Sequence, residues 1–473
     1  MIYIYIVVAV FIFLLLAAIL RTLIIKKSIP VIDNYKRLEN SKENELFKDL
    51  SKLLVCQTID GAENCEKEFE KYECELKTLF PNCFQTCENI DVQGAFLYRF
   101  VGEKNSEKPT LILAHCDVVE ENGKWEHSAF SPTLEDGKIF ARGTIDNKGM
   151  AFSFFSAMEK FITSGGKLKN DLYFLSTKNE ESTSFGAKSV AKYFEQENLD
   201  FSVIFDEGGA VTTEAMPGIA NDIALIGLCE KGYFDIEFSA KSKGGHSGLP
   251  LSSNPIHRLS KFVCEVEKKG YFKVSMPKTV CQMLSSIAPY MTFPLRLLLG
   301  NMWLFKPVVK GVLPAFSPSI GAMMKTTIVF TRAEGSGANN VIPETAKMVA
   351  NIRNLPTESK EEIFAKLSKT AQKHDIEMNI LYDKSASSLT DAGHKEFALL
   401  KETIQKTMPS TLVCPYVTIG ATDCCHLDKF SDAIVRFSPI RATAEQLSAM
   451  HGIDENIGVA ELEKAIEFFY NYK

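Results

Sequence analysis

Apolar and polar positions follow each other along most of the chain in runs that predict alternating strands and helices. The apolar runs "PTLILAHCD" (109–117), "DLYFLSTKNEE" (171–181) and "FSVIFDEGG" (201–209) each end in polar residues, which is typical of buried strands. Helical patterns separate these runs, in "KGMAFSFFSAMEKFI" and "SFGAKSVAKYFEQ". The alternation predicts an α/β domain with a mixed, largely parallel sheet and helices on both faces.

The pattern changes near Phe238. The stretch "GYFDIEFSAKSKGGHSG" alternates as a half-exposed strand does, and further strand and helix patterns follow it. We therefore expect a smaller α+β lid domain of ferredoxin-like type at residues 238–384. It is inserted between two parts of the first domain, residues 28–237 and 385–473.

One segment of the insert is unusually apolar, "YMTFPLRLLLGNMWLFKPVVKGVLPAF". Arg296 and three prolines interrupt it, so a second membrane span is not expected. Three interpretations stay open: the segment is core, it lines a pocket for an apolar substrate, or it rests on a membrane.

The N-terminus predicts a membrane anchor at residues 1–27. Met1 to Leu20 carry no charge, and about 20 apolar residues span a bilayer. Arg21, Lys26 and Lys27 follow, which favours a cytoplasmic position for the rest of the chain. A cleaved leader and a buried helix are the alternatives. The 12 cysteines form no C-x-x-C pair, which fits a reducing compartment.

Composition adds two limits. A chain of 473 residues with 45% hydrophobic and 24% charged positions is long enough for two or three globular domains. The net charge of −6 and the lack of a basic tract argue against a nucleic-acid partner.

Acidic and histidine side chains stand where the predicted strands end. Ligands of α/β proteins gather at the carboxyl ends of the strands, so we expect these side chains to converge. Taken singly, each has an ordinary interpretation; Asp146, for example, could simply cap a helix. The candidates are His115, Asp117, Asp146, Glu180, Glu181, Asp206, Glu207 and His451.

Together these residues suit two divalent metals. Two adjacent ions need a bridging carboxylate, with histidine or carboxylate ligands on each ion, and zinc accepts both donor types. Glu180 and Glu181 are neighbours, and neighbours on an extended strand point in opposite directions. One of them can therefore bind metal while the other faces the reacting water.

The ordered motifs "LAHCDVV", "ARGTIDNKGM", "KNEES", "FDEGG", "GGHSG" and "NNVIPE" closely resemble the co-catalytic-zinc metallopeptidase family. That family contains aminoacylase, Gly-Xaa carboxypeptidase, succinyl-diaminopimelate desuccinylase and N-fatty-acyl-amino-acid hydrolases. The resemblance covers nearly the whole chain after residue 40. It is nearest to the carboxypeptidase and fatty-acyl-amino-acid hydrolase branch.

The resemblance implies a cofactor of two zinc ions, although cobalt and manganese accept the same donors. His115 would bind the first ion, Asp146 would bridge both, and Glu181 and His451 would bind the second. Asp206 would complete the first ion's set. Glu207 is the alternative there, and we prefer Asp206 on strand register.

The resemblance also implies catalytic and substrate-binding roles. Glu180 would act as general base, Asp117 would orient His115, and His246 would stabilise the oxyanion, in some relatives across a dimer interface. The implied substrate contacts are Asn340, Arg353 on the free carboxylate, and the backbone of Gly420. Cys424 and Cys425 depart from the family pattern, which leaves the substrate preference open.

The sequence therefore predicts a membrane-anchored dizinc amidohydrolase. Its substrate would be a small peptide or an N-acyl amino acid, cleaved beside a free α-carboxylate. A homodimer through the lid domain is a further expectation. The alternatives are a biosynthetic deacetylase or desuccinylase, and a catalytically inactive relative that serves as a binding or scaffold protein.

Overall fold

The computed structural model describes residues 1–473 except 26, 31–37, 214–215, 217, 269 and 473. Its largest element is a mixed sheet, and the pairing of its inner strands is mostly parallel, as in β6–β3–β7–β17. The strands along the sheet are β1 (Cys87–Val92), β2 (Ala95–Phe100), β6 (Leu172–Thr177), β3 (Thr110–Leu113), β7 (Val203–Asp206), β17 (Ile434–Arg436), β9 (Ile223–Glu230), β8 (Val211–Thr212) and β18 (Arg441–Ala442), while β16 (Leu412–Thr418) pairs with β9.

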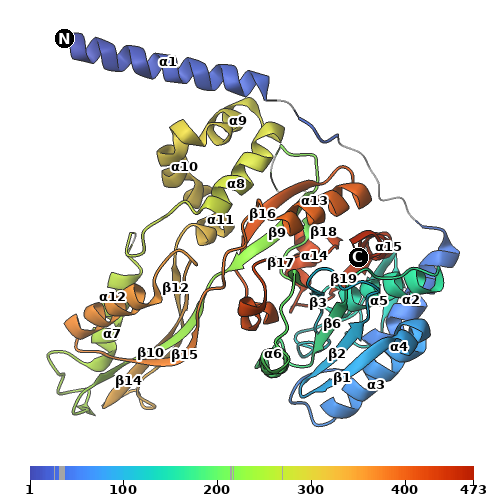
Figure 1. Cartoon of the computed structure of the whole chain (residues 1–473). Coiled ribbons are helices and arrows are strands. Elements are labelled where there is room, and N and C mark those ends of the chain that lie inside the picture. Colours follow the sequence, from blue (N-terminus) through green and yellow to red (C-terminus); the bar gives the residue numbers. More distant parts are fainter. Residues whose placement is uncertain (26, 31–37, 214–215, 217, 269, 473) are drawn as a thin grey trace.

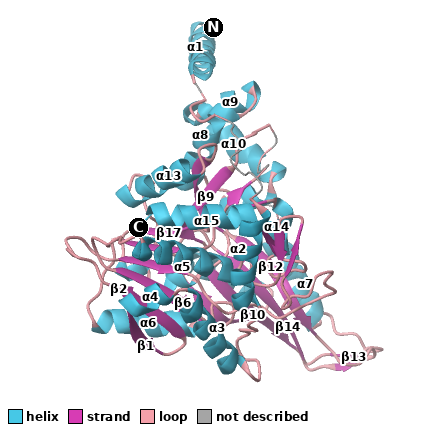
Figure 2. Cartoon of the chain, turned by 90° about the vertical axis from the view of Figure 1, so that its right-hand side faces the viewer, coloured by secondary structure: helices cyan, strands magenta, loops and turns pink. Residues whose placement is uncertain are grey.

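Helices cover both faces of this sheet, as Figures 1 and 2 show. Alternation along β2 explains the two layers, because Phe96 and Tyr98 pack into one core cluster and Ala95 and Leu97 into the other. The helices of this domain are α2 (Asn40–Leu54), α3 (Cys65–Leu79), α4 (Pro81–Thr86), α5 (Lys148–Thr163), α6 (Phe185–Gln196), α13 (Lys395–Thr407), α14 (Ala444–Ala449) and α15 (Val459–Tyr472). Short 3₁₀ turns η2 (Asp423–His426) and η3 (Asp428–Phe430) and a small sheet of β4 (Thr133–Glu135), β5 (Lys138–Phe140) and β19 (Asn456–Gly458) complete it. The expected α/β fold is confirmed.

A second, antiparallel sheet has the order β12–β14–β10–β15. Helices α7 and α12 pack on it through a separate apolar cluster, which gives the βαββαβ order of a ferredoxin-like unit. Its elements are β10 (Tyr233–Lys241), α7 (Pro255–Val266), β12 (Thr327–Glu334), β14 (Thr345–Arg353), α12 (Lys360–Lys373) and β15 (Glu377–Lys384), with a short ribbon of β11 (Gly245–His246) and β13 (Val341–Ile342).

The structure differs from the expected insert in one respect. Residues 278–323 form helices that pack against β9 and β16 of the first domain, through contacts such as those of Leu284 with the Leu412–Val417 strand face. Part of their apolar surface, including Leu284, Leu299 and Val309, is thus buried in a cluster with the first sheet. Only the segments on either side of these helices belong to the second sheet. The helices are α8 (Lys278–Ile287), η1 (Ala288–Tyr290), α9 (Phe293–Gly300), α10 (Met302–Phe316) and α11 (Pro318–Met323).

The N-terminal helix α1 (Ile2–Ile24) is long and apolar enough to cross a membrane, with only 6% of its most apolar window buried. It projects from the molecule beside α9 (Figure 1). Length and composition alone do not separate an anchor from a signal sequence. Residues 31–37, a short distance after α1, lie outside the described residues.

Candidate metal centre

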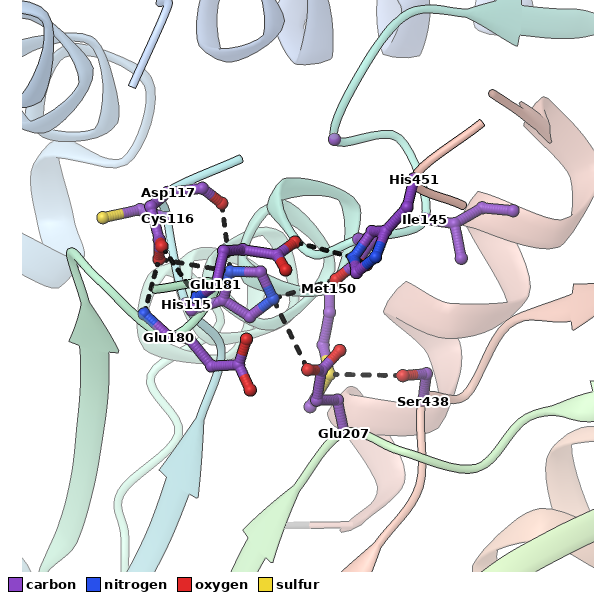
Figure 3. A network of polar contacts seen from close by, with 12 residues as sticks. His115, Cys116, Asp117, Ile145, Met150, Glu180, Glu181, Glu207, Ser438 and His451 are labelled. Atoms are coloured by element: carbon purple, nitrogen blue, oxygen red, sulfur yellow. Dashed lines mark hydrogen bonds and ion pairs between the residues drawn. The ribbon is translucent and has the colours of Figure 1, made fainter. Parts of the chain in front are cut away.

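The polar ends of the parallel strands converge, as expected. His115 and Asp117 follow β3, Asp146 precedes α5, and the acidic pairs follow β6 and β7. His451 comes from the loop after α14 and adopts φ of 59°, a left-handed conformation that is uncommon outside glycine and concentrates at functional sites. Figure 3 shows these side chains pointing toward one another.

Asp146 is shared by two groups of donor atoms. Its Oδ1 lies 2.9 Å from His115 Nε2, and its Oδ2 lies 3.0 Å from His451 Nε2. Glu207 joins the first group, 3.4 Å from the His115 ring, and Glu181 joins the second, 3.0 Å from the His451 ring. The candidate ligand atoms of each group lie within 4.8 Å of one another. The arrangement has the form of two adjacent cation sites with one bridging carboxylate.

Asp146 does not cap helix α5. The N-cap position belongs to Asn147, and no side-chain capping hydrogen bond is formed there. The alternative interpretation of Asp146 as a helix cap is therefore wrong.

The preference for Asp206 over Glu207 is corrected by the structure. Both carboxylate oxygens of Asp206 accept backbone N–H groups, from Glu207 and from Cys424, each at 2.9 Å. Asp206 is the last residue of β7, and its side chain is directed at turn η2 rather than at His115. Glu207, just beyond the strand, reaches the His115 ring instead.

Asp117 holds the backbone that carries the two glutamates. Its carboxylate accepts the N–H of Glu180 at 3.2 Å and of Glu181 at 3.0 Å, while its main-chain oxygen lies 3.0 Å from His115 Nδ1. Glu180 and Glu181 lie in a turn beyond β6, so alternation along a strand is not what separates them. The turn held by Asp117 directs them differently.

Glu455 is a buried carboxylate that the motifs did not single out. Its carboxylate accepts the backbone N–H groups of Gly143, Ile145 and Asp146. It also forms an ion pair with Arg142 at 2.9 Å. These bonds fix the loop that presents Asp146. The only sequence signal was an acidic residue four positions after His451.

Gly149 closes the same loop from the other side. A Cβ at this position would lie 2.1 Å from the carbonyl oxygen of Thr144, so only glycine permits the approach. Gly143 has φ of +87°, which also favours glycine. Both glycines serve the tight backbone around Asp146.

Unbalanced charge makes the centre suitable for cations. Burial would raise the pKa of Asp146, but hydrogen bonds from His115 and His451 hold it below its usual range. Those bonds to Asp146 and to Glu181 raise the pKa of His451 to about 10. Burial and the nearby Asp146 charge raise the pKa of Glu207 to about 8. Without metal, protons on these imidazoles and carboxylates balance the negative charge of the cluster, which bound divalent ions would balance instead. Imidazole and carboxylate groups are also donors that zinc accepts.

Glu180 lines the same site with a half-buried side chain. Burial raises its pKa well above the ordinary value, and the neighbouring charges of Asp423, Glu207 and Glu181 act in the same direction. A carboxyl group with a raised pKa can exchange protons near neutral pH.

A cavity of about 520 Å³ opens in front of the centre. Arg353 and Gly420 line it, as the resemblance implied for substrate contacts. The guanidinium of Arg353 lies 4.1 Å from the ring centre of Tyr233, and its Nε donates to Asn351. An apolar wall is formed by other residues of the lining, Leu225, Tyr416, Ile440, Leu447 and Met450.

His246 and Asn340 lie elsewhere. Both are exposed in or beside the β11–β13 ribbon, where the Asn340 main chain accepts the N–H of Ser247. The His246 ring accepts the N–H of Gly248 at 3.0 Å. Neither residue lines the cavity of the single chain.

Comparison with known proteins identifies relatives along nearly the whole chain. The model of "Peptidase family M20/M25/M40" matches residues 111–472. A probable carboxypeptidase S-like 2 of Dictyostelium discoideum is 30% identical over 459 residues, covering 93% of this chain and 86% of the relative. The N-fatty-acyl-amino acid synthase/hydrolase PM20D1 of Xenopus tropicalis is 27% identical and covers 91% and 86%.

A solved structure shares the fold. The M20 family metallo-carboxypeptidase Sso-CP2 of Sulfolobus solfataricus superimposes with a TM-score of 0.65, at 19% identity, over 92% of this chain and 99% of its own. At this identity the likeness concerns the fold alone.

Proposed function

The chain belongs to peptidase family M20/M25/M40, and from this membership we propose that it cleaves an amide bond beside a free α-carboxylate. Relatives in this family are metal-dependent hydrolases of peptide or amide bonds, and the chain is a hydrolase of this class. The observation that carries the finer proposal is the division of the Asp146 oxygens between two donor groups. Such sharing is what a two-metal hydrolase requires.

Two zinc ions are the proposed cofactor. His115 and Glu207 would hold one ion, Glu181 and His451 the other, and Asp146 both. When bound, the ions lower the pKa of water to about 7 and polarise the scissile carbonyl. Cobalt and manganese accept the same donors.

Glu180 is the proposed general base. It lines the cavity with a half-buried side chain, and Asp117 fixes its backbone through the N–H bond described above. It would take the proton of the attacking water and return it to the leaving amine. A raised pKa supports both transfers near neutral pH.

Arg353 is the proposed ligand of the substrate carboxylate. In the described part of the chain its Nη atoms donate to no protein acceptor, whereas its Nε is held by Asn351. A guanidinium fixed at one end can grip a carboxylate with both remaining groups. The requirement for a free carboxylate in the substrate would follow from this contact.

The apolar wall supports an apolar acyl group or side chain on the other side of the scissile bond. Leu225 and Tyr416 belong to this wall and also pack against the cluster of helices α8–α11. We therefore propose N-acyl amino acids and apolar peptides as the substrate class. The activities for which the two relatives are named, carboxypeptidase-like activity and N-fatty-acyl-amino acid hydrolysis, lie within that class.

A second copy of the chain is proposed to complete the site. His246 is exposed on the second unit and absent from the cavity lining of its own chain. A homodimer through the lid unit would allow the His246 ring to enter the partner's cavity and stabilise the oxyanion. Mixing His246→Asn with Glu180→Gln chains should restore part of the activity that each lacks; no restoration would contradict the shared site.

Helix α1 is the proposed membrane anchor. Arg21 in its last turn and Lys27 beyond it favour a cytoplasmic catalytic domain. Protease protection of the catalytic domain in sealed membrane vesicles would decide the side.

A substrate panel tests the function. Purified protein is assayed with dipeptides and with medium- and long-chain N-acyl amino acids, with and without chelator, and with the C-terminal amides as controls. We expect hydrolysis of the free acids only, abolished by chelator and restored by zinc. Equal hydrolysis of acids and amides would contradict the role of the carboxylate, and chelator-resistant turnover would contradict the metal centre.

A further inference from the structure

Helices α9 and α10 expose apolar side chains at the end of the molecule where α1 projects (Figure 1). Trp303 and Val308 are each 51% exposed, although large apolar groups are normally covered. We call this surface the α9–α10 face, and it consists of Phe293, Leu295, Trp303, Val308 and Val312.

The face is attached directly to α1. The side-chain amide of Asn301, at the junction of α9 and α10, donates to the Ala18 carbonyl at 3.2 Å and to Thr22 Oγ1 at 2.9 Å. All three residues are fully buried. The position of the face relative to the N-terminal helix is therefore set by specific polar contacts.

A second contact holds the chain just after α1. The hydroxyl of Tyr290 accepts the N–H of Ser28 at 3.2 Å and of Ile29 at 2.9 Å. Tyr290 belongs to the turn before α9. The segment Ala18–Ile29 is thus bonded to this helical region at both of its ends, through Asn301 at one end and Tyr290 at the other.

The geometry of α1 gives the depth of the face. A helix of 23 residues is about 34 Å long, slightly more than the roughly 30 Å hydrocarbon core of a bilayer. Ala18 and Thr22 lie about 8 Å and about 14 Å from the helix midpoint at residue 13. If α1 spans a bilayer, Asn301 lies close to the boundary between acyl chains and headgroups. Trp303 is next to it, and tryptophan is enriched at that boundary.

Charge around the face also suits a lipid surface. Residues 278–323, which form helices α8 to α11, contain no aspartate or glutamate and four lysines and arginines, in a chain whose net charge is −6. At the chain-average frequency of 59 acidic residues in 473, about six would stand in this segment. Lys306 and Lys310 of α10 have no carboxylate partner within the described residues. Basic side chains beside a membrane attract anionic headgroups.

We propose that the α9–α10 face docks on the anionic surface of the bilayer that α1 spans. The inference rests on the proposed anchor and goes beyond the proposed hydrolysis. A protein partner would also cover apolar side chains, but the fixed attachment to α1 and the absence of acidic residues favour lipid.

Docking would bring the substrate cavity close to the membrane. Leu225 and Tyr416 line the cavity and pack against the α8–α11 cluster, so one apolar layer separates the cavity from the docked helices. An amphiphilic N-acyl amino acid held in the bilayer would then need to travel only a short way to the metal centre.

Fluorescence of Trp303 provides the test, because the chain has 2 tryptophans and Trp125→Phe leaves Trp303 alone. The full-length Trp125→Phe protein is reconstituted into phosphatidylcholine–phosphatidylserine vesicles. Insertion of α1 is checked separately by resistance to alkaline extraction. We expect lipids brominated near the headgroup end of the acyl chain to quench the emission, and aqueous acrylamide to have little effect.

Matched variants separate docking from general proximity. The double substitution Val308→Glu and Val312→Glu should abolish quenching by brominated lipid while α1 stays inserted. Leu381→Glu, a similarly exposed apolar position on β15, should leave quenching unchanged.

Two results would overturn the proposal with α1 inserted. Quenching by acrylamide and not by brominated lipid would place the face in water. Protection from both quenchers would show that protein covers it. If α1 fails to insert, the proposal is also wrong, because it requires α1 to span the bilayer. None of these measurements depends on hydrolysis. The substrate panel tests the proposed function separately, so the two proposals can fail independently.

Discussion

The structure distinguishes Glu207 from Asp206, and exchanging each carboxylate for its amide should have opposite effects. Glu207 meets the His115 ring, whereas Asp206 accepts two backbone N–H groups. We predict that Glu207→Gln lowers the metal content and removes activity. We predict that Asp206→Asn retains metal but lowers the free energy of unfolding.

The magnitude for Glu207 follows from its pKa in the metal-free protein. Folding raises the pKa from 4.5 to about 8, so the folded state binds more protons than the unfolded state between these values. Stability is therefore lost as the pH rises through this window. One pKa unit corresponds to about 1.4 kcal/mol, and pH 7 lies about 2.5 units above the ordinary pKa. At pH 7 the raised pKa of Glu207 therefore lowers the free energy of unfolding by about 3 kcal/mol. Metal-free Glu207→Gln should be more stable than wild type by up to that amount at pH 7, and by little at pH 4.5.

The magnitude for Asp206 follows from its hydrogen bonds. An asparagine keeps one acceptor oxygen and presents an amide N–H₂ to the second backbone N–H, which is left buried without an acceptor. Loss of a charge-assisted hydrogen bond in a buried site costs about 1.5–3 kcal/mol. Metal-free Asp206→Asn should lose about that much stability relative to the wild type.

The assay is chemical denaturation of chelator-treated protein at several pH values, combined with metal analysis of the untreated protein. Asp146 and its partners are unchanged in both variants, so each serves as the control for the other. Two metals per chain in Glu207→Gln together with metal loss in Asp206→Asn would refute the assignment. A pH-independent stability difference for Glu207→Gln would refute the titration argument.

Three further predictions concern the residues around the metal centre. Glu180→Gln should retain its metal and lose turnover by about 10²- to 10⁴-fold, the usual contribution of a general base; full activity in stopped-flow or steady-state assays would reject that role. Glu455→Gln should weaken metal affinity by about 10- to 100-fold, because the N–H groups of the loop that carries Asp146 lose a carboxylate acceptor. Competition with a chelating dye measures this affinity, and an unchanged value would mean that the loop keeps its conformation without Glu455. Arg353→Lys should raise KM for free acids far more than it lowers kcat, and a lower kcat with an unchanged KM would argue against carboxylate binding.

The sequence predicted the fold well because the apolar runs are long and their periods are distinct. The continuous run before His115 and the helical pattern after Asp146 became β3 and α5 within a few residues of expectation. Residues 278–323 were placed less well. An apolar helix pattern shows that one face is buried but not against which sheet, and these helices pack on β16 rather than on the second unit.

The site was predictable as a set of residues but not in its internal assignments. Strand ends brought His115, Asp146 and Glu181 together, as parallel pairing requires. Between adjacent acids, however, the sequence gives no direction. Asp206 was preferred on strand register, but the choice was decided by the N–H of Cys424, which lies 218 positions away along the chain.

The acids of the centre divide by their partners, and this division explains what the sequence left open. Asp117, Asp206 and Glu455 each accept two or more backbone N–H groups. Asp146, Glu181 and Glu207 instead direct their side chains at the Nε2 atoms of imidazole rings, whereas the Asp117 carboxylate lies 3.4 Å from the Nδ1 atom of His115. A carboxylate whose oxygens already accept backbone N–H groups has few lone pairs left for a cation, and it serves better by fixing the backbone that carries a ligand. Asp117 does this for the Glu180–Glu181 turn and Glu455 for the loop of Asp146, so the positions of the ligands depend on buried charges that would never touch the metal.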